Sequence, residues 1–298
     1  MNITILGQGA IGLLWYHQLA KNASNHVSLM CSARVESAPL MTTFTDINNQ
    51  TTNRALILTQ NDTLPNAELI LLCVKSYHVA TALLPIATQI NANATVIFCH
   101  NGMLDFKQFA SLTQPCYALL TTHGSKRVKP FHAQHTGLGH NDLGLLSGDQ
   151  AEAVQNEIVR TLSKALPSLT LSDNIKEKQW LKLAINCVIN PITAIDNIEN
   201  GQLLNNAYDT VIETLLNEIV TVARYAGITL SLSELKKQVL TVAKNTRKNC
   251  SSMRSDILQQ RKTEIDYING YVVNIAKKAG IQVPENERLL QQVKALEI

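Results

Sequence analysis

The order of hydrophobic and polar positions divides the chain into two parts. Up to about residue 172, short apolar runs alternate with helical stretches, and the apolar runs cover residues 2–6, 26–31, 69–75, 95–102 and 116–125. Continuous apolar runs of this length, separated by helices, are typical of a parallel sheet that is covered on both faces. We therefore predict an α/β domain over residues 1–172.

The remaining elements of this domain follow from the same pattern. Helices are expected over residues 10–22, 77–90, 104–112 and 151–165. The Gly-rich stretch 130–148 contains short alternating runs and predicts antiparallel strands that close the sheet. A last strand is expected near residues 168–172.

From about residue 174 the apolar positions recur with helical spacing. Pro191 and Pro284 are placed at helix starts, while Gly227 and Gly280 follow helix ends. The pattern predicts an all-α domain over residues 173–298. Its helices are expected over residues 174–189, 191–197, 203–226, 231–248, 251–279 and 286–296.

Composition and charge exclude several classes of protein. The 298 residues are 45% hydrophobic, with a formal net charge of +3 and KRVK at 126–129 as the densest basic cluster, so nucleic-acid binding is not expected. No apolar run approaches the roughly 20 residues of a membrane span, and the N-terminus lacks a basic leader, which favours a cytoplasmic protein without membrane contact. The six cysteines form no CxxC pair, so we expect neither a metal site nor a disulfide framework.

Three glycines directly after the first apolar run give the first candidate chemistry. Gly7, Gly9 and Gly12 form G-x-G-x-x-G between a predicted strand and a predicted helix. The first glycine permits a tight turn, the second lets a pyrophosphate approach the backbone, and the third lets the helix pack on the strand. Free N–H groups at the helix start then face the phosphates. We predict a Rossmann-type dinucleotide site, with a pyrophosphate cradle made of Gly7, Gln8, Gly9, Ala10, Ile11 and Gly12.

The end of the second strand indicates the type of dinucleotide. An NAD-binding domain usually carries Asp or Glu there for the ribose 2′-hydroxyl, but no acid occurs between Asn25 and Arg34. Ser32 and Arg34 offer partners for a 2′-phosphate instead, which favours NADP. Which of the two holds the phosphate stays open, and Arg34 is alternatively a loop residue in water.

Polar residues stand where the predicted strands end. Lys75 ends one strand, His100 and Asn101 end the next, and His123 and Ser125 end a third. Ligands of open α/β sheets bind beyond the carboxyl ends of the strands. These ends together therefore predict a ligand site beside the glycine loop.

The helical half contains a polar line within an apolar stretch. In LKLAINCVINP, residues 181–191, Lys182, Asn186 and Asn190 recur at i, i+4 and i+8 and so share one helix face. Burying these groups without partners would be costly, so we expect them to face a ligand. Glu264 lies among apolar residues in KTEIDYINGYVV, where it either pairs with a cation or stands on a solvated helix face.

Several blocks taken together resemble the ketopantoate reductase family, the 2-dehydropantoate 2-reductases of the pantothenate and coenzyme A pathway. The resemblance runs from residue 1 to about 290. It rests on GQGAIG near the N-terminus, HNGM at 100–103, KLAINCVINPITA at 182–194, NG at 200–201, SSM at 251–253 and TEIDYINGY at 263–271.

The resemblance implies a role for individual residues. Lys182 matches the general acid of the family, and Glu264 and Asn101 match further catalytic positions. Substrate contacts are implied for Lys75, Asn101, Lys182, Asn186, Asn190, Asn200 and Ser252. Cofactor contacts beyond the glycine loop are implied for Ser32, Arg34, Lys75, Asn101, Ser125 and Glu264. One departure from the family pattern is His78, three residues after Lys75.

The implied reaction is the NADPH-dependent reduction of ketopantoate to (R)-pantoate. In it, hydride passes to the C2 ketone and Lys182 gives the proton. One alternative is an NADP-dependent reductase of the same architecture that acts on another 2-keto or 3-keto acid. Another is an NADP-binding sensor without turnover. The sequence leaves open whether the protein is a monomer or a homodimer.

Overall fold

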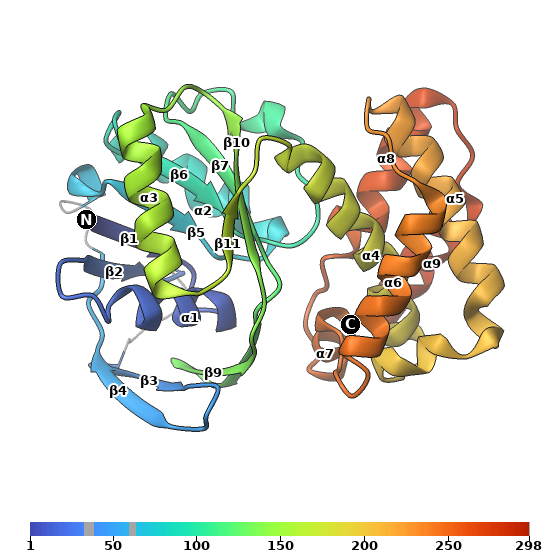
Figure 1. Cartoon of the computed structure of the whole chain (residues 1–298), viewed down its shortest axis with the longest axis horizontal. Helices are drawn as coiled ribbons and strands as arrows, with labels where there is room; N and C mark the ends of the chain where they lie inside the picture. The colour runs from blue at the N-terminus through green and yellow to red at the C-terminus, as the bar shows by residue number, and fades with distance from the viewer. Residues whose placement is uncertain (33–38, 60–63, 298) are drawn as a thin grey trace. The chain divides into compact units, whose positions relative to one another are not determined.

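The computed structural model describes residues 1–32, 39–59 and 64–297. The chain forms two compact units (Figure 1). The first consists of Met1–His100 and Phe106–Ile175, and the second of Asn101–Asp105 and Lys176–Ile298. The predicted fold class is confirmed, because the first unit is a Rossmann-type α/β unit and the second is helical.

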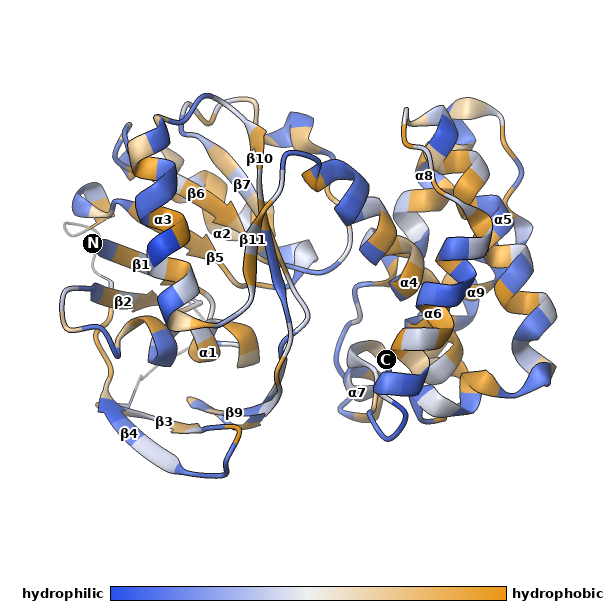
Figure 2. Ribbon diagram, viewed as in Figure 1, coloured by the Kyte–Doolittle hydropathy of each residue, from blue (hydrophilic) through white to orange (hydrophobic). Residues whose placement is uncertain are grey.

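A seven-stranded sheet forms the centre of the first unit, in the order β11-β10-β7-β6-β5-β1-β2. Its strands are β1 (Asn2–Leu6), β2 (His26–Met30), β5 (Leu69–Leu72), β6 (Thr95–Phe98), β7 (Cys116–Thr121), β10 (Asn141–Ser147) and β11 (Leu169–Leu171). All residues of β5 and β6 are buried, and Figure 2 shows these strands as hydrophobic. Full burial explains why the sequence shows continuous apolar runs rather than alternation.

The glycine loop lies at the point in the sheet where the strand order reverses, because β2 and β5 lie on opposite sides of β1. The chain passes from β1 through helix α1 (Ala10–Leu19) to β2 on one side of β1, and later adds β5 on the other side. Leu6 lies opposite both Met30 and Leu72, so these three parallel strands end at the same edge. Ligands of such sheets bind at this switch point.

A second sheet was not predicted. It has the order β4-β3-β9-β8 and consists of β3 (Met41–Thr45), β4 (Thr51–Ala55), β8 (Gly124–Lys129) and β9 (His132–Gly137). Helix α1 packs on β1 and β2 and also on β8 and β9, so its buried Trp15 and the buried Phe44 share one core. Of the strands expected over residues 130–148 to close the main sheet, only β10 does so.

Two α-helices predicted for the first unit are replaced by shorter helical segments. Residues 77–90 form the short helix α2 (Val79–Leu83) between two 3₁₀ segments, Ser76–His78 and Leu84–Gln89. Pro85 stands in the first turn of the second segment, where proline cannot continue the ladder of the preceding helix. Residues 104–112 contain only a 3₁₀ segment, Phe106–Phe109. Helix α3 (Glu152–Ala165) forms as expected.

The second unit packs amphipathic helices around one apolar core. The helices are α4 (Ile175–Ile195), α5 (Asp209–Tyr225), α6 (Leu232–Asn245), α7 (Ser252–Leu258), α8 (Asn269–Ala279) and α9 (Pro284–Leu296). Pro284 starts α9, and Gly227 and Gly280 have φ of +80° and +67° just beyond helix ends, as predicted. Among the described residues, no helix is both long and apolar enough to cross a membrane.

Three helix predictions in this unit were wrong. The helix expected from residue 203 begins at Asp209, after the 3₁₀ segments Asn200–Leu204 and Asn206–Tyr208. Pro191 does not start a helix but lies inside α4, which continues to Ile195. The helix expected over residues 251–279 is instead interrupted between Leu258 and Asn269, where Ile265–Tyr267 form a 3₁₀ turn.

Candidate active site

The glycine loop joins β1 to α1 at the carboxyl edge of the main sheet. Gly7 has φ of +113°, and a Cβ there would lie 2.8 Å from the Cys73 carbonyl oxygen. A Cβ on Gly12 would overlap the carbonyl oxygen of Gly7. The tight packing of the chain therefore requires both glycines.

Gly9 differs from the other two glycines of the loop. Among the described residues, a Cβ at Gly9 would meet only the Cys73 carbonyl oxygen, at 3.9 Å, so these residues leave room for a side chain there. Gly9 is also the N-cap of α1, where no side chain caps the helix and no acid occupies the first turn. The open position and the free N–H groups fit a phosphate group that approaches the backbone closely.

Gln8 ties the glycine loop to the end of β2. Its Nε2 donates to the Ser32 hydroxyl at 3.0 Å, and the Ser32 amide donates to its Oε1 at 3.2 Å. Two hydrogen bonds thus fix Ser32 beside the loop. Arg34, the other candidate for a 2′-phosphate, lies outside the described residues.

Ser125 approaches the same loop from the second sheet. Its hydroxyl in β8 lies 3.0 Å from the carbonyl oxygen of Ala10 and 3.3 Å from that of Gln134. The contact brings Ser125 next to the first residue of α1. Ala10 and Ile11 are both half-buried in that first turn.

Lys75 follows β5 on the other side of β1. The two residues before it, Cys73 and Val74, are those against which a Cβ on Gly7 would press. Lys75 is half-buried and starts the 3₁₀ turn Ser76–His78, where the His78 amide donates to its carbonyl at 2.8 Å. The structure therefore brings Lys75 to the edge that carries the glycine loop.

Helix α4 presents the polar line of the second unit. Because α4 is continuous from Ile175 to Ile195, Lys182, Asn186 and Asn190 stand on one face of a single helix. Lys182 and Asn186 are half-buried, and Asn190 is 6% exposed.

The segment Asn101–Asp105 follows β6 but belongs to the helical unit. The Met103 amide donates to the Tyr267 carbonyl at 2.7 Å. Gly102 has φ of +72°, and a Cβ there would overlap the same carbonyl oxygen. Asn101 is thus brought into the unit that holds α4 and is anchored through its neighbours to the turn that follows Glu264.

Glu264 is 4% exposed, which contradicts its reading as part of a solvated helix face. It precedes the Ile265–Tyr267 turn, and its carbonyl accepts from the Tyr267 amide at 2.9 Å. The preceding Thr263 donates from its amide and its hydroxyl to Glu297 Oε1, at 2.8 and 2.6 Å. A carboxyl group buried to this extent needs a hydrogen-bonding or charged partner.

The two serines of the SSM block have different environments. Ser251 is buried, caps α7 by accepting from the Arg254 amide at 3.1 Å, and has its hydroxyl 2.7 Å from that of Thr193 on α4. Ser252 is the first residue of α7 and is exposed. The Thr193 hydroxyl also lies 3.2 Å from the Asn190 carbonyl, so the block is anchored close to the end of the polar line.

Asn200 is attached to the end of α6 rather than exposed on the surface. It is buried, and its Nδ2 donates to the Thr246 hydroxyl at 2.9 Å. Its Oδ1 is buried and has no hydrogen-bond partner among the described residues. Its clearest role in the structure is to attach the 3₁₀ segment Asn200–Leu204 to the end of α6.

Comparison with known proteins identifies the family of the chain. The family model described as ketopantoate reductase PanE/ApbA matches residues 3–148, and the model of its C-terminal part matches residues 174–297. The chain belongs to the ketopantoate reductase family. It is 35% identical to a 2-dehydropantoate 2-reductase of Vibrio cholerae, over 100% of this chain and 98% of the relative. It is 31% identical to one of Pyrococcus horikoshii, with the same coverage.

Solved structures show the same fold. A PanE/ApbA family ketopantoate reductase from Ralstonia eutropha superposes with a TM-score of 0.86 at 24% identity, covering 100% of this chain and 98% of the other. A D-mandelate dehydrogenase solved with NADH and anilino(oxo)acetate superposes with a TM-score of 0.89, also at 24% identity and with the same coverage. At this identity the likeness concerns the fold alone.

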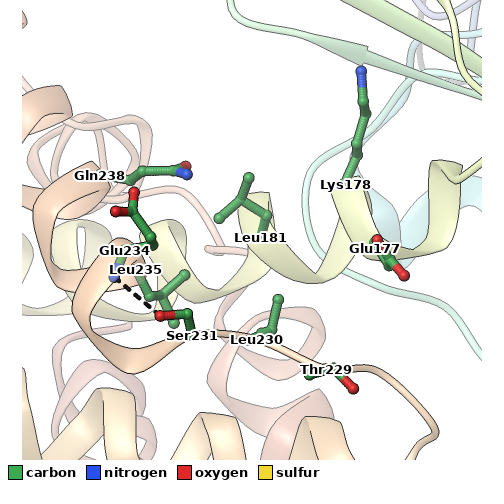
Figure 3. Close-up of a pocket in the computed structure, with 9 residues that line it drawn as sticks. All are labelled: Glu177, Lys178, Leu181, Thr229, Leu230, Ser231, Glu234, Leu235 and Gln238. Atoms are coloured by element: carbon green, nitrogen blue, oxygen red, sulfur yellow. Dashed lines mark hydrogen bonds between the residues drawn. The ribbon is translucent and has the colours of Figure 1, made fainter.

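A pocket of about 220 Å³ on the helical unit is separate from the residues matched to the family blocks (Figure 3). Glu177, Lys178 and Leu181 of α4 form one side, and residues 229–231 with the start of α6 form the other. Figure 3 shows Ser231 capping α6 by accepting from the Glu234 amide. None of the predicted site residues lines this pocket.

Proposed function

We propose that this protein is an NADPH-dependent 2-dehydropantoate 2-reductase that reduces ketopantoate to (R)-pantoate. The observation that carries the proposal is the polar line of α4, Lys182, Asn186 and Asn190, which stands on one face of a continuous helix. It belongs to a chain that matches curated 2-dehydropantoate 2-reductases over its full length.

The first unit holds the cofactor in this proposal. The free N–H groups at the start of α1 and the open position at Gly9 receive the pyrophosphate. Bound NADPH supplies the hydride. Ser32, which Gln8 fixes beside the loop, contacts the 2′-phosphate, and no acid stands nearby in the sequence to repel it. Ser125 and Lys75 complete the cofactor contacts, and Lys75 also contacts the substrate.

The second unit carries the substrate chemistry. Negative charge develops on the ketone oxygen as the C2 carbon is reduced, and a cation fixed beside that oxygen lowers the barrier. Lys182 supplies that positive charge and donates the proton to the oxygen, so that the product carries a neutral hydroxyl. Asn186 and Asn190 donate to oxygens of the bound acid from the same helix face.

The remaining residues orient the reacting groups. Glu264 accepts a hydrogen bond from a substrate hydroxyl and orients Lys182. Asn101, fixed through Gly102 and Met103, positions the cofactor's reactive end and the lysine. Ser252 is exposed at the start of α7 and contacts the substrate. Asn200 adds a substrate contact through its Oδ1, which has no hydrogen-bond partner among the described residues.

A steady-state assay with a panel of substrates tests the proposal. We expect kcat/KM to be highest with ketopantoate and higher with NADPH than with NADH. The alternative, a reductase for another 2-keto acid, is relevant because D-mandelate dehydrogenase has the same fold. Faster turnover of phenylglyoxylate, the keto form of mandelate, would support that alternative, and cofactor binding without any turnover would support a sensor.

A further inference from the structure

Helix α4 contains a proline that should leave one backbone carbonyl without a partner. Pro191 has no N–H, so the carbonyl of Cys187, four residues earlier, loses its normal hydrogen bond within the helix. Cys187 is fully buried, and water cannot replace that bond. The helix nevertheless continues through Pro191 to Ile195.

A side chain from α8 replaces the missing donor. Asn269, the first residue of α8, is 0% exposed, and its Nδ2 donates to the Cys187 carbonyl oxygen at 3.0 Å. The same Nδ2 donates to Asn286 Oδ1, also at 3.0 Å. Both protons of this amide therefore have acceptors, one of which is the carbonyl that Pro191 leaves open.

Glu218 orients the side chain of Asn286, which in turn bonds Asn269. Asn286 Nδ2 donates to Glu218 Oε2 at 2.8 Å, which leaves Asn286 Oδ1 as the acceptor for Asn269. Glu218 also accepts from the amides of Glu285 and Asn286, at 2.9 and 3.0 Å. The chain of hydrogen bonds thus joins α5, α9 and α8 to one point on α4.

That point lies within the polar line. Cys187 directly follows Asn186 and precedes Asn190 by three residues. A change in the backbone at Cys187 would rotate Asn190 relative to Asn186 and Lys182, because the three share one face only while α4 stays helical between them.

We propose that Asn269 is a positioning residue of the active site. It supplies the hydrogen bond that Pro191 cannot make and so keeps Lys182, Asn186 and Asn190 aligned. The inference rests on the proposed function for its effect on turnover, whereas its effect on the backbone of α4 is independent of that function.

A double-mutant cycle between Asn269 and Pro191 tests the proposal. Asn269→Leu removes the donor at similar volume and should lower kcat/KM for ketopantoate by about 10- to 100-fold, since small misplacements of reacting groups cost about this much. The affinity for NADPH should not change. Pro191→Ala restores an N–H at position 191, so the double variant should recover most of the lost kcat/KM. Strictly additive effects would overturn the proposal.

A matched control separates this effect from a general loss of stability. Gln114 in the first unit is also a buried amide that donates to two backbone carbonyls, those of Ile90 and Asn91, each at 3.3 Å. Gln114→Leu should lower the free energy of unfolding but leave kcat/KM of the folded fraction unchanged. Equal losses of kcat/KM in Gln114→Leu and Asn269→Leu would contradict a positioning role.

Hydrogen exchange provides a readout that does not depend on turnover. The amides of residues 188–190 and 192–195 should exchange faster in Asn269→Leu and return toward the wild-type rate in the double variant. If Asn269→Leu alone does not fold, the proposal requires that the double variant folds, and a double variant that is equally unfolded would overturn it. An inactive wild-type protein would instead refute the proposed function and leave the exchange result to decide on Asn269.

Discussion

The glycine loop and helix α4 both present a candidate site, but they are built in different ways. In the loop the backbone itself forms the candidate site, and packing within the loop and against Cys73 and Val74, which follow β5, explains two of the three glycines. On α4 the candidate site consists of side chains on a helix with an internal proline. In our proposal their alignment depends on Asn269 of another helix, which donates to the Cys187 carbonyl. A site made of backbone is therefore visible in a short motif, whereas a site made of side chains depends on residues far along the chain.

Lys182→Ala tests most sharply whether the glycine loop serves the cofactor and the side chains of α4 serve the reaction. Loss of the cation and proton donor should lower kcat by about 10²- to 10⁴-fold, a range typical of general acid catalysis. The affinity for NADPH, measured by fluorescence titration, should stay near that of the wild type. Lys176→Ala, at an exposed position on the same helix, is the matched control. A kcat near normal in Lys182→Ala would remove the lysine from the mechanism.

The buried carboxylate gives the next largest effect. Glu264→Gln keeps the size of the side chain but removes its charge, and a hydrogen bond to a charged group is worth about 1.5–3 kcal/mol. We expect the KM for ketopantoate to rise by about 10- to 100-fold, with a smaller change in the affinity for NADPH. Initial rates over a range of ketopantoate concentrations measure this effect, and an unchanged KM would exclude Glu264 from the substrate site.

Gly12→Ala tests whether the loop is fixed by packing. The added Cβ would overlap the Gly7 carbonyl oxygen, and backbone on both sides cannot yield without moving the loop. Overpacking of this kind costs about 1–3 kcal/mol. Denaturant unfolding should show the loss, and NADPH binding should weaken with it. A fully stable variant would show that the loop is more adaptable than its packing indicates.

Gly9→Ala should separate binding from stability. The Cβ would meet only one atom of the described residues, at 3.9 Å, so the free energy of unfolding should change by less than about 0.5 kcal/mol. The methyl group would occupy the space expected for a phosphate, and the affinity for NADPH should fall by about tenfold, or about 1.4 kcal/mol. Calorimetric titration with NADPH provides the measurement. If binding is unchanged, the space at Gly9 does not serve the pyrophosphate.

The main sheet could be predicted because its strands are buried on both faces. β5 reads LILL and β6 reads TVIF, and apolar runs this short are more typical of buried strands than of helices. The second sheet was missed because its strands are short and polar. β3 reads MTTFT. It pairs with β9, where Thr43 lies opposite His132, and no local pattern reveals a contact between residues so far apart in the sequence.

The candidate site shows the same limit. The glycine motif and the i, i+4, i+8 spacing identified the residues that face ligands in our proposal. The helix boundary at Pro191 was wrong because the prediction considered only the local effect of proline, whereas Asn269, 78 positions later in the numbering, satisfies the carbonyl. A proline inside an apolar run is itself a signal, since it implies a donor elsewhere for the carbonyl four residues before it.

The most direct test of the central claim is the stoichiometry of the reaction. Purified protein is mixed with ketopantoate and NADPH, the loss of NADPH absorbance is followed, and pantoate is quantified by chiral chromatography. The account predicts that each NADPH consumed yields one (R)-pantoate. Absence of NADPH consumption with ketopantoate, or consumption without pantoate, would contradict it.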